Sequence, residues 1–285
     1  MSQTAAFDQA VERDYNPRLG TPDFQSYFDR EAALSEATRK KLPHRRDVSY
    51  GSSPLQALDV FGAGPPGGAK GKPIAIFIHG GYWRALDKAS YSFFAEPVVA
   101  AGGIAVTVNY DLCPKVTIDD IVAQVRASIA WVAREAAGLG GDAGRIVICG
   151  HSAGGHLAAM ACLHDWTKES LPADLIKGAC LVSGVYDIAP VMRTSIQEQV
   201  RMTPDIARRN SPLLMPPPRP GIKLMVSYGG KETRGFIDQS RRYAAYLRAN
   251  LPVVLELPDD NHFSICDRLA DPKDPQVRFI LDLFG

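Results

Sequence analysis

A serine lies at the centre of a Gly-x-Ser-x-Gly pattern, in the stretch Gly150-His-Ser152-Ala-Gly154. An apolar run, Arg145–Cys149, leads into the pattern, and a helix-forming run leaves it. A strand that turns abruptly into a helix strains the turning residue, and glycines on either side let the turn close. The helix N-terminus also favours negative charge that develops at the hydroxyl. We therefore predict that Ser152 is a nucleophile.

A serine hydroxyl needs a general base at neutral pH. For a strand–turn–helix serine, the base follows the nucleophile in the chain and an acid lies between them. Of the six histidines, His164 and His262 lie beyond the serine's own turn and first helical turn. His164 belongs to the helix that leaves the turn, whereas His262 lies in a polar loop after an apolar run. Functional groups gather at such strand ends, so we predict that His262 is the base.

The acid that orients the base should also follow a strand. Glu232 comes shortly after the apolar run Ile222–Ser227, and it is the preferred residue. Four aspartates remain as alternatives: Asp187, which follows an earlier run, Asp238, which falls on the next helix, and Asp259 and Asp260, which adjoin the histidine.

Two adjacent glycines follow another apolar run, in Ile78-His79-Gly80-Gly81-Tyr82-Trp83. Backbone N–H groups without a side chain in the way can stabilise an oxyanion by about 3–4 kcal/mol each. The predicted oxyanion donors are the N–H groups of Gly81, Tyr82 and Ala153. His79 is expected to tie this loop by hydrogen bonding rather than to catalyse. The residues predicted to contact substrate are Gly80, Tyr82, Trp83 and His151, with the alternative that Tyr82 and Trp83 are core aromatics.

The elements that must position these residues follow from alternating apolar and helical stretches. The extended runs are 47–50, 55–61, 74–78, 103–109, 145–149, 179–182, 222–227 and 252–257. The helical stretches are 24–41, 86–101, 118–137, 154–164 and 236–249, with a final helix that ends at Phe284. Short apolar strands that alternate with helices indicate an α/β fold with a mostly parallel sheet covered on both faces.

The length of 285 residues fits a single domain over 1–285. Residues 1–47 are polar and form an N-terminal helical extension in this prediction. The proline-rich segment 186–221 breaks the alternation of strands and helices, and it is predicted to form a small cap-like excursion.

Composition excludes several classes of function. The net charge of +1 gives no basic surface for nucleic acid. The five cysteines are odd in number and include no CxxC pair, so we expect buried thiols and no metal site. No apolar stretch is long enough to serve as a signal or a membrane span. We therefore expect a cytoplasmic protein without cofactor or membrane partner, acting on a small molecule, with a homodimer left open.

These motifs together resemble the kynurenine formamidase (arylformamidase) branch of the α/β hydrolases. The resemblance rests on the His79-Gly-Gly-Tyr-Trp83 block, which is fairly specific for the branch, and on the more generic serine motif. It also includes Ser183-Gly-Val-Tyr-Asp187 and Gln239-Ser240, and it extends from about Asp14 to the end of the sequence.

The resemblance implies an α/β-hydrolase fold with an eight-stranded, mostly parallel sheet and a Ser–acid–His triad. It also implies hydrolysis of N-formyl-kynurenine to kynurenine and formate. By position, Ser152 and His262 match the family's nucleophile and base, while Glu232 stands where an aspartate is familiar. A carboxylesterase for short aryl or alkyl esters is the alternative with the same machinery, and a non-catalytic binding protein on a hydrolase fold is the other.

Overall fold

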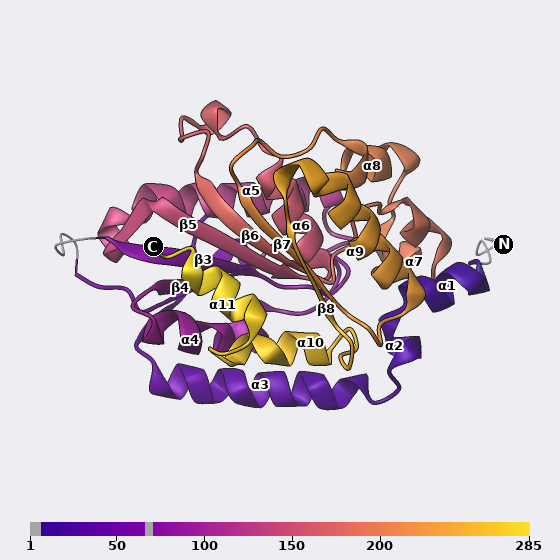
Figure 1. The fold of residues 1–285 in the computed structure, drawn as a ribbon, viewed down its shortest axis with the longest axis horizontal. Helices are drawn as coiled ribbons and strands as arrows, with labels where there is room; N and C mark the ends of the chain where they lie inside the picture. Colours follow the sequence, from indigo (N-terminus) through magenta and orange to yellow (C-terminus); the bar gives the residue numbers. More distant parts are fainter. Residues whose placement is uncertain (1–6, 66–70) are drawn as a thin grey trace.

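The computed structural model describes residues 7–65 and 71–285, so residues 1–6 of the predicted N-terminal extension lie outside the described part. Its centre is an eight-stranded sheet with the strand order β1-β2-β4-β3-β5-β6-β7-β8 (Figure 1). The strands are β1 His44–Ser49, β2 Ala57–Phe61, β3 Lys72–Ile78, β4 Ile104–Val108, β5 Gly141–His151, β6 Ile176–Val182, β7 Lys223–Gly229 and β8 Val253–Leu257.

The sheet is parallel from β4 through β3, β5, β6 and β7 to β8, whereas β1 and β2 join its edge in antiparallel pairing. Each parallel strand therefore ends at the same side of the sheet, which brings the loops that follow β3, β5, β7 and β8 together. The predicted α/β fold with an eight-stranded, mostly parallel sheet is confirmed.

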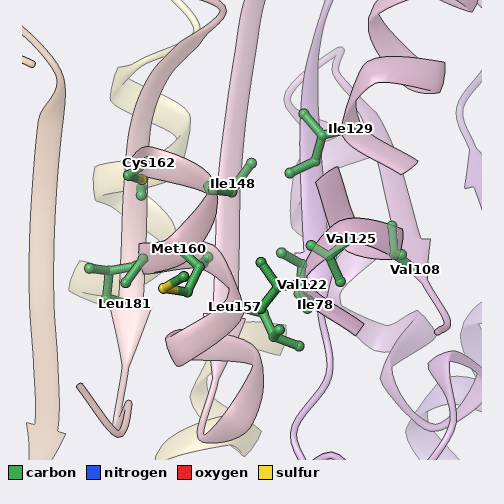
Figure 2. Packing of buried hydrophobic residues seen from close by; sticks show 14 of the residues in the cluster. Ile78, Val108, Val122, Val125, Ile129, Ile148, Leu157, Met160, Cys162 and Leu181 are labelled. Atoms are coloured by element: carbon green, nitrogen blue, oxygen red, sulfur yellow. The ribbon is translucent and has the colours of Figure 1, made fainter. Parts of the chain in front are cut away.

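Helices cover both faces of the sheet. On one face lie α5 Ile118–Glu135, α6 Ala153–Cys162 and α9 Arg234–Tyr246; on the other lie the 3₁₀ segment η1 Lys88–Phe94, α4 Ala95–Ala100, α10 Ser264–Asp267 and α11 Pro275–Asp282 (Figure 1). Figure 2 shows the first face, where Leu157 and Met160 of α6 and Val122 and Val125 of α5 pack toward the strands. Burial of these side chains, at about 1.5–3 kcal/mol each, fixes the helices on the sheet.

The chain before β1 forms three helices: α1 Gln9–Tyr15, α2 Pro17–Gly20 and α3 Phe24–Lys41. The long helix α3 runs outside η1, α4 and α10 as an additional layer (Figure 1). Its bounds agree with the predicted helical stretch. Its fully buried side chains are polar, namely Glu31, Ser35 and Thr38, and the Ser35 hydroxyl donates to the Ser90 carbonyl at 2.6 Å.

The structure corrects the prediction of one continuous helix over 86–101. Instead η1 and α4 follow each other, and η1 itself is interrupted at Tyr91, whose φ of −119° and ψ of 17° lie outside the helical region. Pro97 has no N–H with which to continue an α-helical ladder from Phe93. The Phe93 carbonyl accepts from the N–H of Ala95 instead.

The excursion over 186–221 is a set of short helical turns: η4 Ala189–Arg193, α7 Gln197–Val200, α8 Pro204–Arg209 and η5 Pro212–Leu214. Four more 3₁₀ turns in the described part of the chain follow longer helices or precede strands. They are η2 Ala137–Leu139, η3 Trp166–Glu169, η6 Leu247–Asn250 and η7 Arg268–Ala270, of which η7 follows α10. No helix in the described ranges is long and apolar enough to cross a membrane.

Candidate active site

Ser152 sits at the sharp turn between β5 and α6. Its backbone has φ 58° and ψ −120°, a conformation that costs a non-glycine residue about 1–3 kcal/mol. A Cβ on Gly150 would lie 2.2 Å from the Gly154 carbonyl oxygen, and one on Gly154 would lie 2.0 Å from the Ile78 carbonyl oxygen. Both flanking positions therefore require glycine, and the packing they allow holds the serine in its strained geometry.

Three side chains from three separate loops form a continuous hydrogen-bonded chain. The Ser152 hydroxyl lies 3.0 Å from Nε2 of His262, and Nδ1 of His262 lies 2.7 Å from Oε2 of Glu232. The tautomer that satisfies both bonds carries its proton on Nδ1, so Nε2 is free to accept the serine proton. Such an arrangement can activate a hydroxyl for attack on a carbonyl carbon.

The Glu232 carboxylate is held by more than the histidine. Its Oε1 accepts from the Gly229 N–H at 2.7 Å and from the Ser183 hydroxyl at 2.6 Å. These two donors, together with the imidazole, fix the carboxylate's orientation in a buried site. The role of the Ser183 hydroxyl was not predicted from the sequence, although Ser183 directly follows a predicted strand.

The four alternative acids are engaged elsewhere. Their partners are Arg242 for Asp187 (3.6 Å), Arg234 for Asp238 (3.4 Å), Lys231 for Asp259 (3.1 Å) and Arg268 for Asp260 (2.6 Å). The geometry therefore favours Glu232 as the acid among the residues that the sequence offered.

His151 supports the imidazole of His262 from the side. Its Nε2 donates to the His262 carbonyl oxygen at 2.8 Å, and the two rings lie 4.8 Å apart. Burial lowers the pKa of His151 to about 3, so this ring is neutral at physiological pH. Phe236 packs on His262 at 4.2 Å between ring centroids.

The glycine loop after β3 adopts a tightly constrained path. Gly81 has φ 101°, and a Cβ there would lie 2.1 Å from the Ala85 carbonyl oxygen. His79 holds the loop as expected: its Nδ1 lies 2.8 Å from the Gly80 carbonyl oxygen, and its ring stacks on Tyr110 at 4.3 Å. Burial lowers the pKa of His79 to about 4, which keeps it uncharged.

The predicted oxyanion donors remain available. Within the described part of the chain, the backbone N–H groups of Gly81, Tyr82 and Ala153 have no hydrogen-bond acceptor. Gly81 and Tyr82 line the same cavity as the Ser152 hydroxyl, and Ala153 begins α6 directly after it. The N-terminal dipole of α6 adds to the stabilisation of a negative oxygen there.

Two of the predicted substrate contacts need correction. Trp83 is fully buried and does not line the cavity; its Nε1 donates to Nδ1 of His156 at 3.1 Å, which ties the loop to α6. Gly80 packs under the serine turn, where a Cβ would lie 3.0 Å from that of Ser152. Both residues therefore hold the loop in place, whereas Tyr82 and His151 line the cavity as predicted.

The cavity beside Ser152 has a volume of about 50 Å³. The N-terminal helices supply a group of its lining residues that sequence reasoning missed: Asn16, Pro17, Arg18, Phe28 and Glu31. Ile196 is the contribution of the 186–221 excursion, whose role as a cap stays a prediction. A signal for α2 was present in the Asn16-Pro17 pair, since Asn favours the N-cap and Pro the first helical position.

Replacing Gly81 with alanine should lower kcat by about 100-fold or more, because the loop must move and its oxyanion donors move with it. Steady-state kinetics of the purified variant measure this. Gly102→Ala is the matched control: Gly102 also has a positive φ, 80°, but a Cβ there meets nothing within 4 Å. The control should lose stability alone, and equal kcat losses in both variants would contradict the role of the loop.

A mostly parallel eight-stranded sheet, with a Ser–His–Glu chain at its strand ends, defines this protein as an α/β hydrolase. The model of the BD-FAE family matches residues 58–201. A kynurenine formamidase of Salmo salar is 36% identical over 96% of both chains, and one of Danio rerio is 33% identical over 95% of this chain and 92% of its own. The chain belongs to the kynurenine formamidase family.

A solved structure from Silicibacter sp. TM1040, described as a putative thioesterase, has a similar fold. It superposes with a TM-score of 0.81 at 31% sequence identity, and the match covers 95% of this chain and 98% of the other. The similarity therefore includes the N-terminal helices as well as the sheet.

Proposed function

We propose that this protein is a serine hydrolase that removes a small acyl group from an aryl amide, with N-formyl-kynurenine as the substrate and kynurenine and formate as products. The observation that carries the proposal is the hydrogen-bonded chain from Ser152 through His262 to Glu232, open to a cavity beside unpaired backbone N–H groups. Membership of the kynurenine formamidase family supports the substrate class.

In the proposed reaction, the Ser152 hydroxyl attacks the formyl carbon while Nε2 of His262 takes its proton. The carbonyl oxygen becomes an oxyanion bound by the N–H groups of Gly81, Tyr82 and Ala153. His262 then protonates the leaving aryl amine as the C–N bond breaks, which leaves a formyl ester on the serine. Water activated by His262 hydrolyses that ester, releases formate and restores the hydroxyl.

The test of amide against ester specificity compares N-formyl-kynurenine with p-nitrophenyl acetate on the same purified protein. We expect kcat/KM to be higher for the formamide, because in the proposed reaction His262 protonates an amine leaving group. A preference for the ester by about tenfold or more, with negligible formate release from N-formyl-kynurenine, would favour the carboxylesterase alternative. Formate is measured directly with a coupled dehydrogenase assay.

We also propose that the protein acts in the cytoplasm on this small molecule, without a nucleic-acid or membrane partner. All five cysteines are buried free thiols, which supports a reducing compartment.

A further inference from the structure

Glu31 of α3 is a buried carboxyl that lines the cavity beside Ser152. The residue is 2% exposed, and among the described residues its Oε2 has no hydrogen-bond partner. The other two buried polar side chains of α3 differ from it: Ser35 donates to the Ser90 carbonyl oxygen, and Thr38 bonds to Leu34 and Glu96. The packing of α3 therefore gives the buried hydroxyls of Ser35 and Thr38 hydrogen-bond partners, but among the described residues it leaves Oε2 of Glu31 without one.

An unpartnered carboxyl in an apolar site is costly, because no water or donor replaces the hydration that it loses. Phe28 and Tyr91 line the same cavity as Glu31, and neither side chain carries a positive charge that could pair with its carboxylate. Burial, followed by the nearby Asp267, raises the pKa of Glu31 to about 8. The Cys266 thiol and Arg30 act in the opposite direction and only partly offset this rise.

The other charged groups of the cavity lie on different elements. Arg18 of α2 and Arg84 of the glycine loop line it, with Arg84 bonded to Gln199 of the 186–221 excursion. The imidazole of His151 is neutral, and that of His262 is engaged with the acid and the serine. The cavity thus presents one carboxyl that can become an anion and two guanidinium groups.

We propose that Glu31 is a specificity residue that binds a primary ammonium on the leaving-group part of the substrate. The inference rests on the proposed function, whose substrate carries a primary ammonium and a carboxylate on its amine portion. The ammonium supplies the donor that Oε2 lacks, and Arg18 and Arg84 are the cations available to the substrate carboxylate. The last side-chain torsion of glutamate is broad and roughly two-fold, so the two carboxylate oxygens can exchange places and bring Oε2, which is buried in this structure, toward the ligand.

Binding of an ammonium should release the proton of Glu31, since the pair is stable only as carboxylate and cation. The KM for an amine-bearing substrate should therefore fall as the pH rises from 6 toward 7, where an α-amino group is still mostly protonated. A substrate without the amine should show no such dependence on Glu31.

The experiment measures kcat and KM of the full chain for N-formyl-kynurenine and for its analogue in which hydrogen replaces the amino group. In Glu31→Gln, the ratio of kcat/KM for the two substrates should fall by about 10- to 100-fold. The loss should appear as a higher KM, and the fall of KM between pH 6 and 7 should disappear. Glu36→Gln, an exposed position on the same helix, is the matched control and should keep the ratio. Equal losses on both substrates, or an unchanged ratio, would overturn the proposal.

A binding measurement separates this inference from the proposed function. Calorimetry with the Ser152→Ala protein compares kynurenine with its deamino analogue, and repeats the comparison after adding Glu31→Gln. If the wild-type protein cleaves neither formamide, the proposed function fails, but a preference for kynurenine that is lost with Glu31→Gln would still support the ammonium site. If kynurenine shows no preference over the analogue, the role of Glu31 is wrong.

Discussion

Ser152→Ala should lower kcat on N-formyl-kynurenine by about a millionfold, because removal of a serine nucleophile leaves only binding and oxyanion stabilisation. The hydroxyl points at Nε2 of His262 from 3.0 Å, and the strained turn serves to hold it there. The loss should therefore appear in kcat, with KM changed far less. Formate release over long incubation at high enzyme concentration measures a residual rate of this size.

The control for Ser152→Ala is a measurement of its thermal stability. An alanine in place of Ser152 removes one hydroxyl and leaves the backbone turn, so the thermal midpoint should change by only a few degrees. A fluorophosphonate probe should label the wild-type protein at Ser152 and leave the alanine variant unlabelled, as read by mass spectrometry. An alanine variant with near-normal turnover would exclude Ser152 as the nucleophile, and failure of the wild type to react would favour a non-catalytic binding protein.

Glu232→Gln should lower kcat by about 10³- to 10⁴-fold, although it changes only one oxygen for an amide nitrogen. A glutamine can donate to Nδ1 of His262, which favours the tautomer with its proton on Nε2. That tautomer cannot accept the serine proton, and the charge that stabilised the imidazolium is also lost. Kinetics under the same conditions as for Ser152→Ala measure the effect.

Two matched controls make this result specific. Asp238→Asn and Asp187→Asn make the same kind of change at residues that the sequence also offered as acids. Asp238 pairs with Arg234 on the surface of α9, and Asp187 lies near Arg242. Both variants should keep kcat within about threefold, since each carboxylate pairs with an arginine that has no part in the Ser152–His262–Glu232 chain. A large loss in either one, with Glu232→Gln active, would reassign the acid.

Much of the candidate site could be predicted because its signals are local in the sequence. The glycines around Ser152 and the Gly80-Gly81 pair each follow an apolar strand, and the parallel sheet then brings their ends together without further information. The sequence already favours Glu232 among five acids, but the contacts that distinguish it, from Gly229 and Ser183, depend on how β7 and β6 align and are visible only in the structure.

The N-terminal part of the cavity could not be predicted for a physical reason. Sequence analysis finds a packed helix by its apolar periodicity, and the fully buried side chains of α3 are Glu31, Ser35 and Thr38. A polar buried face has no such pattern, so the helix was found but its buried side was not. The prediction that Trp83 contacts substrate was wrong for a different reason. An aromatic side chain beside a glycine loop can point into the cavity or toward α6, and the hydrogen bond to His156 shows that Trp83 points toward α6.

The aromatic cluster that joins α3 to the loop of the base links distant parts of the chain. Phe24, Tyr27 and Phe28 all pack against Phe263, and Arg30 pairs with Asp267. During translation, a nascent chain that has emerged only through α9 would hold the serine and the acid but lack the base and the residues that dock α3. Chains that end before the segment 262–267 should therefore have no hydrolytic activity, because they lack the base and the contacts that dock α3.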